Sequence, residues 1–169
     1  MFSKFKQHLQ DMRTIKSLCE GAESEARKAG QERPGAEHYV LSALGLDDGS
    51  AARVFGRLGV SPQAYRVALA GLHAGALNTL GIDAGGVGKP QPAAGKPAAL
   101  FDSQPSGQAL MQALPELAKR SPAPLCGAHV LLAAAGMQHS LAARALRSMD
   151  VEPQALARAA EEELGVAHA

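Results

Sequence analysis

Apolar side chains recur at steps of three and four residues along most of the chain, which is the spacing of one face of an α-helix. The pattern is clear in residues 15–29. Its apolar and small positions are Ile15, Leu18, Cys19, Ala22, Ala26 and Ala29. Gly30 follows at once, and glycine commonly ends a helix. We therefore expect a first helix that stops near residue 29.

Three further helices are predicted in the first half of the chain. They cover about residues 36–46, residues 51–58, and a stretch from residue 62 that presents Tyr65, Ala68, Leu69 and Leu72 on one face. Ser50 and Ser61 stand just before the second and third of these helices, where N-cap serines are found. Pro62 follows Ser61, and proline is favoured at the first helical position.

The chain contains an internal repeat. Residues 38–64 align without a gap on residues 129–155, at a shift of 91 positions, with eleven identities in 27 positions. The second copy predicts helices near residues 110–117, 128–137, 141–149 and 153–164. Pro115 lies in the first of these, where it removes a backbone hydrogen bond, so we expect a kink or a late helix start there.

These patterns predict an all-α fold of about eight helices, arranged as two pseudo-symmetric four-helix repeats. The repeats are residues 1–80 and 101–169, and together they form one domain. Residues 81–100 between them are rich in Gly, Pro, Ala and Lys, show no apolar period, and are expected to be a flexible connector. Apolar residues make up 46% of the chain but aromatic residues only 4%, so the core must consist mostly of Leu, Val and Ala.

The charge pattern favours neither a nucleic-acid nor a membrane partner. The formal net charge is +1, without the clustered basic excess of nucleic-acid-binding domains. We interpret the locally basic start, with Lys4, Lys6, Arg13 and Lys16 against Asp11, as a solvated helix face. No run approaches eighteen apolar residues and no signal sequence is visible, so we expect a cytoplasmic protein. The cysteines Cys19 and Cys126 are then expected to be thiols rather than a disulfide.

No motif for a cofactor, a metal or catalysis is found, and we expect a protein that is not an enzyme. The stretch Gly85–Lys89 resembles a phosphate-binding loop, but its spacing is wrong and Pro90 replaces the Ser or Thr that would hold Mg²⁺. Zinc-site and nucleophile motifs are missing as well. Cys19 or Cys126 could act as a nucleophile only if a histidine lay beside it in space.

Two repeated residue types have a structural and a functional interpretation. His38 and His129 stand at equivalent helix starts, where each is either a largely buried imidazole bonded to a neighbouring backbone group or carboxylate, or a ligand or pH switch. We favour the structural interpretation because a packing unit repeats as a whole. Arg53 and Arg144 also repeat, and their stems are expected to cover apolar surface between helices.

Several short motifs, in order, resemble the Clp N-terminal (Clp repeat) domain that precedes the ATPase rings of ClpA and ClpC unfoldases. They are Gly35-Ala36-Glu37-His38-Tyr39-Val40-Leu41, Asp48-Gly49-Ser50-Ala51-Ala52 and Leu58-Gly59-Val60-Ser61. The start Met1-Phe2-Ser3-Lys4-Phe5 resembles that of ClpC-type members, and Ala22–Arg27 resembles their first helix. The resemblance covers nearly the whole chain apart from the connector.

This resemblance implies eight helices in two halves and a role in recognising adaptors or substrates for an ATP-dependent protease. It also implies protein-binding roles for Glu37, Phe2 and Phe5. In ClpC-type members the Glu of each Glu-His pair can contribute to recognition of phosphorylated arginine, but Ala128 replaces that Glu in the second copy. For Glu37 itself, a favourable interaction with the helix dipole is the simpler alternative.

Three functional hypotheses follow. The first is a stand-alone, non-catalytic module that binds a Clp ATPase, an adaptor, or substrate proteins or peptides. The second is a module that sequesters a small hydrophobic or peptide ligand. The third, which we favour least, is a small hydrolase.

Overall fold

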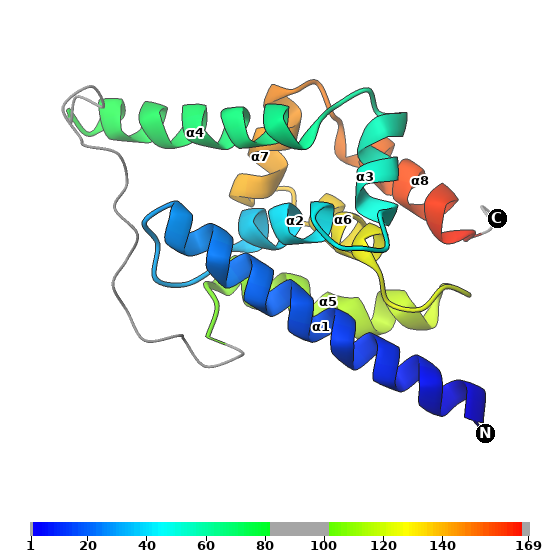
Figure 1. Ribbon diagram of the computed structural model, residues 1–169. Helices are drawn as coiled ribbons and strands as arrows, with labels where there is room; N and C mark the ends of the chain where they lie inside the picture. The colour runs from blue at the N-terminus through cyan, green and yellow to red at the C-terminus, as the bar shows by residue number, and fades with distance from the viewer. Residues whose placement is uncertain (1, 82–101, 167–169) are drawn as a thin grey trace.

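The computed structural model describes residues 2–81 and 102–166, which form eight α-helices and no strand (Figure 1). The helices are α1 (Phe2–Lys28), α2 (Ala36–Leu44), α3 (Ser50–Arg57), α4 (Pro62–Thr79), α5 (Pro105–Lys119), α6 (Gly127–Ala135), α7 (Leu141–Ser148) and α8 (Pro153–Leu164). The predicted all-α fold of about eight helices is confirmed. The predicted connector falls almost wholly outside the described residues, as does the loop-like stretch at 85–89.

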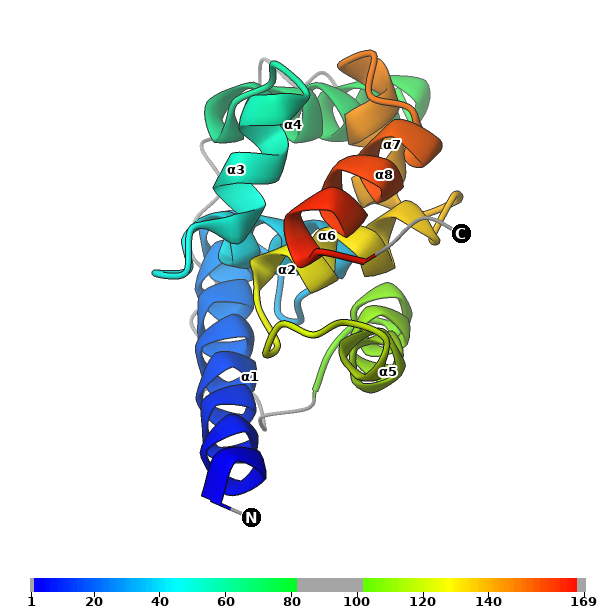
Figure 2. The same cartoon turned by 90° about the vertical axis from the view of Figure 1, so that its right-hand side faces the viewer.

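The helices lie in three layers, with α2 and α6 in the middle (Figures 1 and 2). Helices α1 and α5 lie on one side of this pair, and α3, α4, α7 and α8 lie on the other. The sequence explains the central position in part, because α6 is apolar except for His129 and α2 is apolar except for Glu37, His38 and Ser42. Every residue of α2 from Ala36 to Ala43 is buried, and α6 leaves only Leu132 partly exposed.

The two copies of the repeat exchange partners. Helix α4 of the first copy packs on α7 of the second, α8 of the second packs on α3 of the first, and α2 packs on α6. Buried apolar side chains of both copies therefore belong to a single core. The fourth helix of each copy therefore packs partly on the other copy, although α8 packs mainly on α6 of its own copy.

Helix starts follow the predicted signals in part. Ser61 caps α4 as expected, since its hydroxyl accepts a hydrogen bond from the Ala64 amide at 3.1 Å. Ser50 is not an N-cap: Gly49, at φ 65°, holds that position and Ser50 is the first helical residue. A glycine is required there because this left-handed conformation is unfavourable for other residues.

Two helices are longer than their apolar patterns. Helix α1 begins at Phe2, well before the apolar period that starts at Ile15. Helix α5 runs from Pro105 through Pro115 to Lys119, so the late start considered for it is wrong. Within the described ranges, no helix is both long and apolar enough to cross a membrane.

Candidate functional site: a groove between α1, α2 and α4

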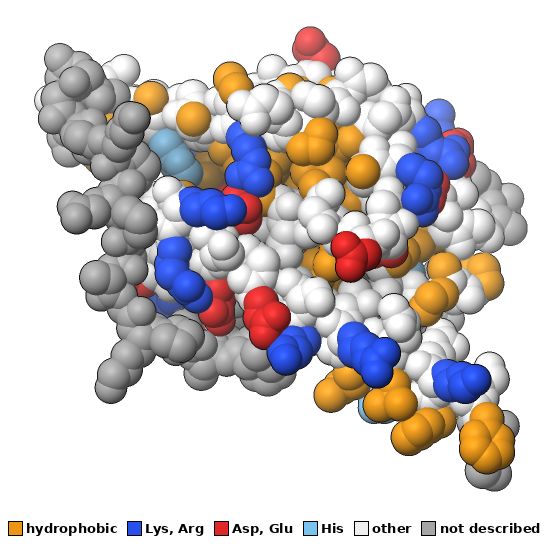
Figure 3. Space-filling view, in the orientation of Figure 1, with side chains coloured by type: hydrophobic (Ala, Val, Ile, Leu, Met, Phe, Trp, Pro, Cys, Tyr) orange, Lys and Arg blue, Asp and Glu red, His pale blue; other side chains and the backbone are white. Residues whose placement is uncertain are grey.

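A groove runs along α2, with α1 and α4 as its walls. It consists of two adjoining hollows, one of about 640 Å³ and one of about 370 Å³. Both hollows are lined by Glu25, Leu41 and Arg66. The larger hollow is otherwise lined mainly by the inner face of α4, and Figure 3 shows apolar side chains under that helix with charged side chains at the rim.

The groove exists because α4 is held on the bundle only near its start. Of its eighteen residues, only Tyr65 and Leu69 are buried. The equivalent helix of the second copy, α8, buries four of its twelve residues, including Leu156 and Leu164. At these two positions α4 has the larger Tyr65 and the polar His73. The part of α4 after Leu69 thus keeps Ala70, Ala74 and Leu77 available to the hollow.

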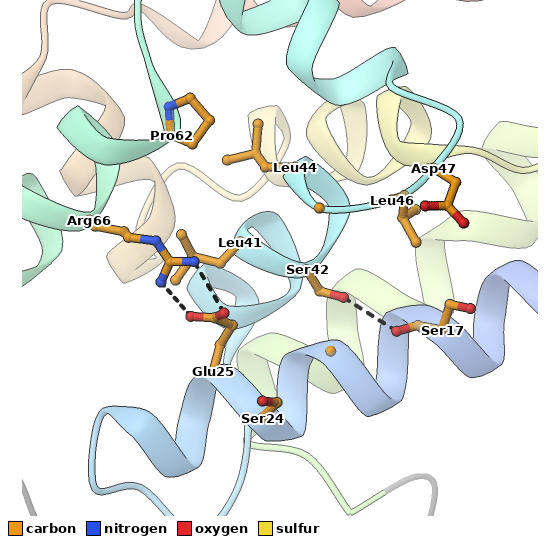
Figure 4. A pocket seen from close by; sticks show the side chains of 12 residues that line it. Ser17, Ser24, Glu25, Leu41, Ser42, Leu44, Leu46, Asp47, Pro62 and Arg66 are labelled. Atoms are coloured by element: carbon orange, nitrogen blue, oxygen red, sulfur yellow. Dashed lines mark hydrogen bonds and ion pairs between the residues drawn. The ribbon is translucent and has the colours of Figure 1, made fainter.

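An ion pair crosses the groove between the two hollows. Arg66 on α4 forms two hydrogen bonds to the Glu25 carboxylate on α1, one from Nη1 to Oε2 and one from Nη2 to Oε1 at 3.1 Å (Figure 4). Lys28 Nζ donates to the same carboxylate at 3.0 Å. The bond from Arg66 is the main reason that the pKa of Glu25 falls to about 2. Both walls of the groove are therefore linked at neutral pH through one fully ionised carboxylate.

Glu37 lies in the wall of the larger hollow but is almost fully buried, with 3% of its surface exposed. Burial raises the pKa of its carboxyl above the usual value. The side chain folds back over Gly35, where an added Cβ would lie 2.7 Å from both carboxylate oxygens. A carboxyl group without water around it gains more from a cationic partner than an exposed one does. The structure thus gives Glu37 a place at the groove, and its binding role stays a prediction.

His38 and His129 are buried imidazoles bonded to backbone, as the structural interpretation predicted. The Gly35 amide donates to His38 Nδ1 at 3.0 Å, and the Cys126 amide donates to His129 Nδ1 at 3.2 Å. Burial is the main reason that the pKa of His38 falls to about 4 and that of His129 is lowered. Glu37 Oε1 lies 3.4 Å from His38 Nδ1. At neutral pH this approach is not an ion pair, because the imidazole is uncharged.

The structure places a cysteine beside a histidine, which the sequence left open. Cys126 Sγ lies 3.3 Å from His129 Nδ1. That nitrogen already accepts the Cys126 amide hydrogen, and the opposite Nε2 is buried and has no hydrogen-bond partner among the described residues. A catalytic pair needs a free base and a group that orients it. In the first copy Gly35 stands in place of Cys126 and His38 makes the same bond, so the contact belongs to the helix cap.

The other predicted positions are placed as follows. Both cysteines are free thiols, as expected, and burial raises the pKa of Cys19. Arg53 Nε donates to Glu163 of α8 at 2.6 Å, while Arg144 is exposed. The expected packing of the two stems on apolar surface stays a prediction. Across the described part of the chain, no three His, Cys, Asp or Glu side chains group in a way that could hold a metal.

Phe2 and Phe5 do not line the groove. Their side chains are 85% and 63% exposed at the free end of α1. Phe5 and Glu25 are separated by twenty residues of one helix, which corresponds to about 30 Å. The three residues predicted to bind protein therefore do not form one site. The pair of Glu25 and Arg66 was missed because the two residues meet across 41 positions of sequence, and only Glu25 lies in one of the motifs that carry the resemblance.

Neither a family model nor a curated protein matches this sequence. Function is therefore inferred from the groove and from the resemblance of the short motifs.

Proposed function

We propose that the chain is a non-catalytic protein-binding module that takes a peptide segment with apolar side chains into the groove between α1, α2 and α4. The carrying observation is the pair of adjoining hollows that share Leu41 and are separated by the Glu25–Arg66 ion pair. Two hollows in a row suit a ligand with successive side chains. The ion pair offers both a carboxylate and a guanidinium to peptide groups at the rim.

The apolar side chains that line the larger hollow favour binding of a peptide segment there. Leu69, Leu77 and Leu80 line it together with small alanines, and Leu80 is 75% exposed. Apolar surface that stays in contact with water on a folded protein commonly marks an interaction site. Glu37 at the same wall would then face a cationic side chain or amine of the bound segment.

The resemblance to Clp N-terminal domains supports a more specific role. In this role the module acts in the cytoplasm and binds an adaptor or a substrate of a Clp ATPase, or binds the ATPase itself. A module that sequesters one small hydrophobic ligand is the second candidate. It is supported by the volume of the larger hollow, which lies in the range of small-molecule sites, roughly 300–1,000 Å³.

The proposal is tested with fluorescein-labelled β-casein, a protein without stable tertiary structure, followed by fluorescence anisotropy. Ala70 is exposed on α4 and lines the larger hollow, so Ala70→Glu places a carboxylate in the groove with little effect on folding. Val67 is 62% exposed on the same helix but does not line the hollow, so Val67→Glu is the matched control. We expect Ala70→Glu to weaken binding about tenfold, the cost of about 1.4 kcal/mol, and Val67→Glu to leave it nearly unchanged.

Equal behaviour of the two variants would contradict the groove as the binding site. Binding of an apolar dye without any binding of casein would instead support the small-ligand candidate. The same labelled casein tests the hydrolase hypothesis. We expect no release of labelled fragments, and a release that disappears in Cys126→Ala would show that the protein is an enzyme.

A further inference from the structure

The first half of α1 projects beyond the other helices (Figures 1 and 2). Four large apolar side chains on this segment are exposed: Phe2, Phe5, Leu9 and Met12, at 85%, 63%, 43% and 56%. Their spacing of three, four and three residues places them within an arc of about 80° on the helix surface. We call these four residues the apolar stripe.

The apolar stripe is not an extension of the face that packs on the bundle. The core-facing side of α1 is marked by Leu18, Ala22 and Ala26, which are fully buried. On a regular helix that side is rotated by about 120° from the apolar stripe. The stripe therefore faces away from the core, and packing among residues 2–81 and 102–166 does not account for it.

A row of cations borders the apolar stripe along one edge, visible in Figure 3 as basic side chains beside apolar ones on the lower helix. Lys6 follows Phe5 and Arg13 follows Met12, so the two cations hold the same position relative to the stripe. No ion pair to either is found among the described residues. Asp11, the one acidic residue among residues 2–19, instead faces the bundle and accepts the Leu125 amide at 2.9 Å.

We infer that the apolar stripe is a docking surface for an acidic amphipathic helix of another protein. The stripe has the spacing of the a and d positions of two heptads, and Lys6 and Arg13 both fall on the e position, whose charge selects the partner in coiled coils. A partner helix with apolar residues at its a and d positions, flanked by Glu or Asp, would match both the apolar stripe and the cations beside it. No residue of the apolar stripe lines either hollow, although Met12 lies only about 8 Å along α1 from Ser17 of the smaller hollow. The inference therefore does not rest on the proposed function.

A second copy of the chain fits this surface less well. Two such helices in antiparallel orientation would bring the e positions together, so that Lys6 and Arg13 would face the same cations of the other copy. In parallel orientation the e positions face g positions, which here are His8 and Ile15 and carry no acid. The charges thus favour a different, acidic partner over self-association.

The inference is tested with two labelled helical peptides that share Leu at a and d and differ only in carrying Glu or Lys at e and g. We expect the full chain to bind the Glu peptide at least tenfold more tightly than the Lys peptide. The charge-reversed variant Lys6→Glu/Arg13→Glu should invert this preference. Phe5→Ser/Leu9→Ser should abolish binding of both peptides while circular dichroism shows an unchanged helical fold.

Three results would overturn the inference. The first is equal binding of the two peptides, or binding of neither. The second is dimerisation of the wild type in sedimentation experiments that is lost in Phe5→Ser/Leu9→Ser. The third is binding to vesicles containing phosphatidylglycerol without any binding of the Glu peptide, because a lipid surface would then be the occupant.

Discussion

Mild acid should destabilise this protein through His38, the buried histidine at the start of α2. The imidazole accepts the Gly35 amide hydrogen through Nδ1, so protonation of that nitrogen breaks the bond and places a charge in the core. In the folded protein the pKa is lowered from 6.5 to about 4. The unfolded chain therefore binds the proton more tightly, and stability is full above pH 6.5 and is lost as the pH falls toward 4.

The size of the effect follows from the two pKa values. At about 1.4 kcal/mol per unit, a shift from 6.5 to about 4 corresponds to about 3 kcal/mol in full. About 2 kcal/mol of this is already lost at pH 5. His129, whose pKa is also lowered, acts in the same direction. Glu37 acts in the opposite direction, because its raised pKa makes the folded state hold a proton more tightly.

The variant His38→Gln isolates the contribution of His38. Glutamine keeps an acceptor that can reach back to the Gly35 amide, as it does in a capping box, and it does not titrate. Urea unfolding followed by circular dichroism gives the free energy of unfolding at pH 7, 6 and 5. Between pH 7 and 5 the wild type should lose about 2 kcal/mol more than His38→Gln. His139→Gln changes an exposed histidine and should follow the wild type. Parallel pH profiles of wild type and His38→Gln would refute the reasoning.

Two further variants test the electrostatics of the groove. Glu37→Gln should raise the free energy of unfolding at pH 7. The pKa of this buried carboxyl is raised, so its contribution to stability falls as the pH rises from about 4.5 through that pKa. A variant that is less stable than the wild type at pH 7, measured by urea unfolding, would contradict this. Arg66→Ala should cost only about 0.5–1 kcal/mol, but it should move the pKa of Glu25 from about 2 back toward 4.5, which a carbon-detected NMR titration measures. A Glu25 pKa that stays near 2 in Arg66→Ala would show that Arg66 does not cause the shift.

The sequence was informative where structure depends on neighbours along the chain. Ser61 and Pro62 mark the start of α4 through an interaction within one helical turn. Each repeated histidine likewise bonds to the residue three positions before it. The start of α1 was not placed at Phe2, although Phe2, Phe5, Leu9 and Met12 already recur at helical spacing. These apolar residues are exposed, and Lys4, Lys6 and His8 stand between them, so they do not continue the buried period that starts at Ile15.

The groove could not be predicted because it depends on how the helices diverge in space. Arg66 gives no hint in sequence that it meets Glu25, and the spacing of α4 from α2 is set by packing between the two copies. The repeat alignment did contain one signal, since Tyr65 and His73 stand where the second copy has Leu156 and Leu164. Unequal side chains at equivalent positions indicate that the two fourth helices cannot pack alike.

The most direct test of the groove as a binding site is amide hydrogen exchange of the protein with and without β-casein, read by mass spectrometry. We expect added protection in residues 66–79 of α4 and at the end of α1, with residues 141–164 of α7 and α8 unchanged. Protection confined to α7 and α8, or no change in α4 while casein is bound, would contradict this expectation.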